Sequence, residues 1–107
     1  MIFTVNKNNW ILQFVRTNSE ELRRSDGVYT LGVTDNTTKT VTIADNLSER
    51  MTDKVLCHEL THVYSFENGC QMDMRTEEIV ADFLSLYGRD IVYMADDLMK
   101  IFPKKVA

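Results

Sequence analysis

The chain has 107 residues, which is enough for one small domain with a single modest core. Apolar residues make up 44% of it and charged residues 26%, a balance typical of a globular protein rather than a disordered or fibrous one. The net charge is −4 and the basic residues are scattered, which excludes the basic stripe of a nucleic-acid-binding surface. We therefore expect a single domain over residues 1–107 with no nucleic-acid partner.

The first residues lack a basic region followed by a long apolar run and a small-residue cleavage site, so no secretory leader is expected. No apolar stretch has the length of a membrane span. We expect a cytoplasmic protein without a membrane partner, in which Cys57 and Cys70 stay reduced and Cys57 is packed rather than catalytic. The sequence does not indicate an oligomeric state.

Two β-hairpins are expected in the first half of the chain. Residues 2–5 and 10–15 are rich in apolar and β-branched types and flank a polar, turn-forming run. Residues 28–35 and 39–44 form a second such pair. Between the hairpins, residues 20–24 follow a capping sequence and predict a short helical turn.

Two helices are expected in the second half. The first runs from about residue 48 to about residue 66, with capping residues before it, apolar residues at three- and four-residue spacing, and Asn68 or Gly69 as a left-handed cap. The second runs from about 76 to about 101, capped by Thr76, with Gly88 as a bend or division and Pro103 marking its end. Most methionines are predicted to fill the core or lie in loops. These elements predict an α+β fold in which a small antiparallel or mixed sheet packs against both helices.

Both histidines of the chain lie in the sequence His58-Glu59-Leu60-Thr61-His62, inside the first predicted helix. Residues four apart lie one turn above each other on a helix, so His58 and His62 can point at one metal ion. Glu59 lies about 100° further round the helix, where it can reach a water in an open coordination position. This geometry is typical of a zinc hydrolase, although imidazole and carboxylate ligands also suit Mn, Fe or Co.

A catalytic zinc site of this kind needs a third protein ligand. The candidates that follow the motif are Glu67, Cys70, Asp73, Glu77 and Glu78. Glu78 is favoured because Asp82 lies one turn beyond it and can accept a hydrogen bond from a liganding histidine. Glu77 is the main rival, and its matching position holds Ala81. The stripe that contains Glu78 and Asp82 also continues to Ser85 and Arg89, which is equally typical of a solvent-facing helix surface.

The sequence here resembles known families. His58-Glu59-x-x-His62 followed by Glu78-x-x-x-Asp82 is similar to the gluzincin arrangement of zinc metallopeptidases, and Glu78-x-x-Ala81-Asp82 resembles the ImmA/IrrE family of bacterial and phage metallopeptidases. The resemblance covers roughly residues 28 to 88. It implies a minimal zincin-like domain that cleaves peptide bonds in a protein substrate, such as a repressor, with Glu59 as general base. Residues 84–88 stand where the family carries a Leu-Leu-Met-Pro-like segment.

Other zinc classes and one non-enzymatic role were compared with this prediction. Metzincins need a glycine and a third histidine after the motif, where this chain has Ser65 and Asn68, and SprT-like proteases also need a third histidine. The alternative function is a catalytically silent, zinc-stabilised protein-binding module, an inhibitor or adaptor. Glu59 favours the enzyme, because a structural site has no use for a general base and usually has four protein ligands. Candidates for stabilising a reaction oxyanion are Tyr29, Tyr64, Tyr87, Tyr93, Arg75 and Arg89.

Overall fold

The computed structural model describes residues 1–101, so Pro103 lies outside the described residues. The elements in chain order are β1 (Ile2–Val5), β2 (Asn8–Val15), the 3₁₀ helix η1 (Glu20–Leu22), β3 (Gly32–Asp35), β4 (Thr40–Ala44), α1 (Glu49–Glu67), α2 (Met74–Phe83), the π-helical turn η2 (Leu84–Gly88) and α3 (Arg89–Ile101). The predicted α+β class is confirmed. Among the described helices, none is both long enough and apolar enough to cross a membrane.

The four strands form one mixed sheet in the order β1-β2-β4-β3. Both predicted hairpins are present, because β1 pairs with β2 and β3 pairs with β4 in antiparallel fashion. The two hairpins meet through β2 and β4, which run parallel with Leu12 opposite Val41 and Phe14 opposite Ile43. This order makes β1 and β3 the outer strands of the sheet.

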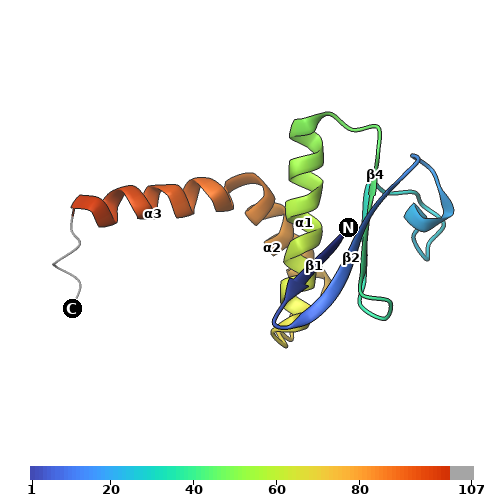
Figure 1. Cartoon of the computed structure of the whole chain (residues 1–107), viewed down its shortest axis with the longest axis horizontal. Helices are drawn as coiled ribbons and strands as arrows, with labels where there is room; N and C mark the ends of the chain where they lie inside the picture. Colours follow the sequence, from blue (N-terminus) through green and yellow to red (C-terminus); the bar gives the residue numbers. More distant parts are fainter. Residues whose placement is uncertain (102–107) are drawn as a thin grey trace.

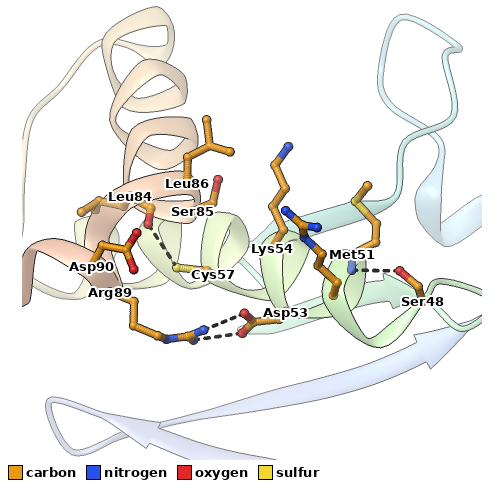
Figure 2. Close-up of a pocket in the computed structure, with 11 residues that line it drawn as sticks. Ser48, Met51, Asp53, Lys54, Cys57, Leu84, Ser85, Leu86, Arg89 and Asp90 are labelled. Carbon is orange, nitrogen blue, oxygen red and sulfur yellow. Dashed lines mark hydrogen bonds and ion pairs between the residues drawn. The ribbon is translucent and has the colours of Figure 1, made fainter. Parts of the chain in front are cut away.

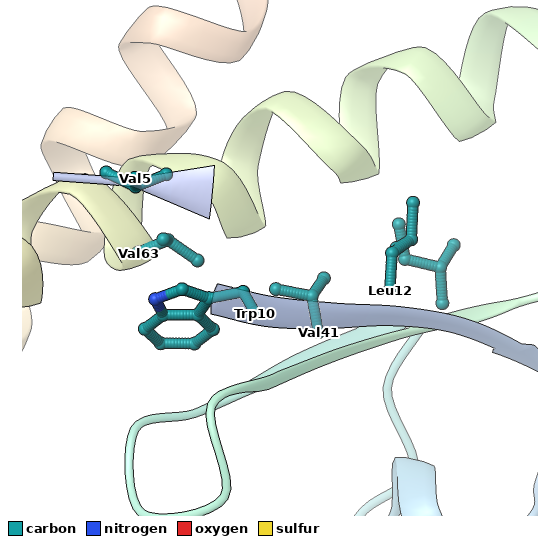
Figure 3. Close-up of a cluster of buried hydrophobic side chains, with 6 residues drawn as sticks. Val5, Trp10, Leu12, Val41 and Val63 are labelled. Carbon is teal, nitrogen blue, oxygen red and sulfur yellow. The ribbon is translucent and has the colours of Figure 1, made fainter. Parts of the chain in front are cut away.

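Helix α1 lies across one face of the sheet, and the chain around η1 lies on the side away from α1 (Figure 1). The core forms between α1 and the sheet, where Trp10, Val41 and Val63 are fully buried (Figure 3). The apolar stripe predicted for α1 is only partly covered. Its ends, Met51 and Phe66, are 38% and 40% exposed.

The ends of α1 are capped by local side chains and backbone. The Ser48 hydroxyl accepts a hydrogen bond from the Met51 N–H at 3.1 Å. Gly69 has a φ of +62° after the C-terminal end, so the prediction of a left-handed cap at Asn68 or Gly69 is confirmed at Gly69. These caps fix the length of α1 and therefore the axial positions of its histidines.

Glu67, the last residue of α1, fastens the helix to both hairpins. Its carboxylate accepts a hydrogen bond from the Asn8 side chain and lies 2.9 Å from Lys39 Nζ. Lys39 in turn lies over the Trp10 ring, with Nζ 5.1 Å from the ring centroid. The Glu67 side chain is only 2% exposed whereas that of Lys39 is 38% exposed, so this contact lies at the edge of the core, where it links α1 to the sheet.

The second predicted helix begins earlier than expected and is not continuous. The Asp73 carboxylate accepts a hydrogen bond from the Thr76 N–H at 2.7 Å, so Asp73 and not Thr76 is the N-cap. Gly88 ends the π-helical turn η2, which divides the helix into α2 and α3 as its sequence allowed. Beyond η2, α3 projects away from α1 and the sheet (Figure 1). The prediction that methionines fill the core or lie in loops is wrong for four exposed helical residues, Met51 of α1, Met74 of α2 and Met94 and Met99 of α3.

Candidate metal centre

The two histidines of α1 and one carboxylate of α2 converge on a single point. His58 Nε2 and His62 Nε2 lie 3.4 Å apart, as expected for residues one helical turn apart. The Glu78 carboxylate spans both rings, with Oε2 3.0 Å from His58 Nε2 and Oε1 3.0 Å from His62 Nε2. His58, His62 and Glu78 therefore form a group that could hold a metal ion across two helices.

A second carboxylate holds the far nitrogen of each ring. His58 Nδ1 lies 2.9 Å from Asp82 Oδ1, the partner predicted from the sequence. His62 Nδ1 lies 3.2 Å from Glu77 Oε2, a contact that the sequence reasoning missed. A carboxylate that accepts from Nδ1 keeps the proton of a neutral imidazole on that atom, so both Nε2 atoms offer lone pairs to the same point.

The spacing of these atoms fits a zinc ion. Zinc–nitrogen bonds of about 2.0–2.1 Å at tetrahedral angles separate two liganding nitrogens by about 3.4 Å. His58 Nε2 and His62 Nε2 are separated by 3.4 Å. Each histidine also has a carboxylate on its other nitrogen, the arrangement that orients liganding imidazoles and raises their basicity. The donor set thus matches a site with three protein ligands.

The other candidate ligands have different partners. Glu67 is bound to Asn8 and Lys39, and Asp73 caps α2. Cys70 is an exposed free thiol. Glu77, the main rival, is 7% exposed and contacts His62 Nδ1 rather than the point between the two Nε2 atoms. Of the five candidates, only Glu78 reaches both histidines at the metal-facing nitrogens.

Glu59 is buried between α1 and β3. It is 7% exposed, and its Oε1 accepts a hydrogen bond of 2.8 Å from the Thr34 hydroxyl. Burial raises the pKa of the Glu59 carboxyl above its ordinary value, whereas the Thr34 hydrogen bond and the two nearby histidines oppose this rise. A carboxyl that is buried next to two metal-facing histidines and is held by one hydroxyl is a suitable proton acceptor.

The close approach of β3 to Glu59 depends on Gly32. A Cβ atom at this position would lie 2.7 Å from Val55 Cγ1 and 3.0 Å from Glu59 Cγ. Any other residue would push the strand or the Glu59 side chain out of place. Gly32 and Thr34 were predicted only as strand residues, since nothing in the spacing of a single strand indicates which helix residue it will touch.

A pocket of about 450 Å³ lies along α1, and none of His58, His62 and Glu78 is among the residues that line it (Figure 2). It lies between the first half of α1 and η2, and its lining includes Lys54 and Cys57. The Cys57 thiol lies 3.8 Å from the Leu84 carbonyl oxygen, so this cysteine is packed against η2, as predicted. Arg89, a predicted candidate for stabilising the oxyanion, makes a two-pronged ion pair with Asp53 at 2.7 and 3.0 Å. Its guanidinium is therefore already bound to a carboxylate.

Comparison with known proteins adds no family to this description. No protein-family model matches the chain, and neither curated proteins nor solved structures match it. The interpretation of the site therefore rests on its own geometry. What that geometry supports directly is a possible metal site of two histidines and one glutamate in a small α+β domain.

Proposed function

We propose that the chain is a zinc-dependent metallopeptidase of the minimal zincin-like type, acting on a specific protein substrate such as a regulator. The observation that carries the proposal is the convergence of His58 Nε2, His62 Nε2 and Glu78 on one point, with a carboxylate behind each ring. Three protein ligands leave a fourth position for water or substrate, which distinguishes catalytic from structural zinc sites.

The chain's own residues supply positioning and proton transfer. Zinc held by His58, His62 and Glu78 would polarise a carbonyl and acidify water. Glu59 would accept a proton from the attacking water at its carboxylate and return it to the leaving amine. Glu59 suits this role by its position, because its carboxylate, on the helix that carries both histidines, is buried and is held by the Thr34 hydroxyl.

The sheet offers a place for the substrate. β3 is an outer strand, and its Thr34 contacts Glu59 directly. A peptide that pairs with the outer edge of β3 by main-chain hydrogen bonds therefore passes beside the general base.

Replacing Glu59 tests this function. We expect wild type to bind one zinc ion and to cleave members of a mixed library of quenched fluorescent peptides, whereas Glu59→Gln keeps zinc and loses about 10²–10⁴-fold in turnover. Glu49→Gln, an exposed change in the first turn of the same helix, leaves turnover unchanged. Metal is measured by plasma mass spectrometry after dialysis, with His58→Ala as the metal-free reference and Glu78→Ala as the test of the third ligand.

Three results would contradict the proposal at different levels. Full zinc occupancy in Glu78→Ala would show that the third ligand is wrong. Unchanged turnover in zinc-loaded Glu59→Gln would show that Glu59 is not the base. Zinc binding by wild type without cleavage of any library member would instead favour the alternative, a silent zinc-stabilised binding module.

A further inference from the structure

Helix α3 presents an apolar surface that no described residue covers. No residue of α3 is buried, and its only extensive neighbour among the described elements is η2. Met94 is 59% exposed and Ile101 is 67% exposed. The uncovered side chains are here called the α3 apolar face and comprise Ile91, Val92, Met94, Ala95, Leu98, Met99 and Ile101.

The α3 apolar face is continuous and broad. At about 100° per residue, its members occupy roughly half of the helix circumference. At its root a shallow recess is lined by Phe83, Tyr87, Asp90, Ile91 and Met94. A helix of 13 residues, about 20 Å long, is only marginally stable by itself in water. A short helix with a broad, exposed apolar face is typical of a site where another molecule binds.

The charges of α3 are sorted around this face. On the same helical projection, Asp90 and Asp97 lie along one edge of the apolar face and Asp96 lies along the other. The two cations lie on the back of the helix, where Arg89 is bound to Asp53 of α1. Lys100 is 3.6 Å from Asp97, but both side chains are largely exposed, so this pair is weak. The apolar face is therefore bordered by acid on both sides.

This arrangement excludes two occupants on charge grounds. A helix that lies on a membrane carries Lys and Arg at the borders of its apolar face, whereas aspartates there are repelled by anionic lipid. A second copy of this chain would bring aspartate against aspartate in either orientation, because both edges are acidic. The remaining occupant that matches both the apolar width and the acidic borders is a basic amphipathic helix.

We propose that α3 is a docking helix for a protein partner, which binds through an amphipathic helix with an apolar stripe bordered by Lys or Arg on both sides. The apolar stripe covers Met94 and Leu98 at the centre of the face, and the basic side chains pair with Asp90, Asp96 and Asp97. The proposal does not depend on the metal centre. The two-pronged ion pair of Arg89 with Asp53 links the root of α3 to α1, so a partner docked on α3 lies beside the rest of the domain.

A pair of synthetic peptides tests the proposal on the full chain. Both are about three heptads long with leucine at the a and d positions, and they differ only in carrying lysine or glutamate at e and g. We expect fluorescence anisotropy to show that the lysine peptide binds about tenfold or more tightly than the glutamate peptide. Hydrogen exchange of residues 89–101 should slow when the lysine peptide is bound.

Variants locate the binding and separate its two components. Leu98→Asp should abolish binding of both peptides, whereas Tyr93→Gln, a change on the back of α3, should leave it intact. Changing Asp90, Asp96 and Asp97 to asparagine should remove the preference for the lysine peptide over the glutamate peptide. Both peptides should still bind through their leucines.

Three results would overturn the proposal. Equal binding of the two peptides would remove the charge argument. Self-association in sedimentation velocity that Leu98→Asp abolishes would make a second copy the occupant. Co-sedimentation with phosphatidylcholine–phosphatidylserine vesicles that the same change abolishes would make a lipid surface the occupant.

Discussion

The domain body, which consists of the sheet and α1, and helix α3 carry the same kinds of apolar side chain. The domain body buries these side chains, whereas α3 exposes them. Trp10 and Val63 are fully buried between the sheet and α1, whereas Leu98 on α3 is 48% exposed. Apolar periodicity is present in both regions, so it shows which face of an element is to be covered but not what covers it. The difference indicates that α1 folds against its own chain and that α3 is suited to another.

The largest effect is expected for Trp10→Ala. Trp10 is fully buried, lies under Lys39 and packs against the rest of the core, so its loss should cost about 3–5 kcal/mol of unfolding free energy. Chemical denaturation followed by circular dichroism measures this, with Tyr93→Ala on α3 as an exposed aromatic control. A similar midpoint in both variants would mean that the two regions do not differ in packing.

An intermediate and pH-dependent effect is expected at Glu67. The Asn8 amide and the Lys39 ammonium hold the pKa of this carboxyl below its ordinary value of 4.5. A pKa that is lower in the folded state gives stability that is complete above the unfolded pKa and is lost as pH falls through the folded pKa. Wild type should therefore lose stability below about pH 4.5, and Glu67→Gln should lose less of it over the same range.

Stability curves from pH 3 to pH 7 test the role of Glu67, with Glu21→Gln as a control because Glu21 is an exposed residue of η1. The control should keep the acid dependence of wild type. If Glu67→Gln also kept it, the link between α1 and the hairpins would not be the source of the pH dependence.

The smallest effect is expected for Leu98→Ser. Because Leu98 touches no covering element in the described part of the chain, its replacement should change the unfolding free energy by no more than about 0.5 kcal/mol. Thermal and chemical denaturation of the isolated chain measure this. A loss of about 2 kcal/mol or more of unfolding free energy would show that the α3 apolar face is already covered. In that case α3 and the domain body would not differ in packing.

The sequence predicted what local chemistry determines. Turn residues and β-branched runs predicted both hairpins, and the four-residue spacing of His58 and His62 predicted that their rings share one face of α1. Asp82 was predicted to bind a liganding histidine because its spacing from Glu78 and its carboxylate chemistry are visible within one helix, and the structure shows that this histidine is His58.

The sequence could not predict contacts that depend on how elements are placed together. Thr34 and Gly32 meet Glu59 only because β3 occupies the edge of the sheet next to α1. Glu77 was set aside because Ala81 follows it by one turn, yet it binds His62 from the buried side of α2. The start of α2 was predicted at about residue 76, whereas the helix begins at Met74. Asp73 and Thr76 are both good N-cap residues, and the sequence does not show which of them caps the helix.

The π-helical turn η2 changes the phase between the two parts of the helical segment. A regular helix would keep Glu78, Asp82, Ser85 and Arg89 on one stripe, whereas an i→i+5 turn holds one extra residue and rotates α3 relative to α2 by about 100°. Arg89 thereby leaves the stripe of the metal centre and meets Asp53. The turn therefore fixes the angle between the metal ligands and the α3 apolar face, so that the two surfaces point in different directions from one helical segment.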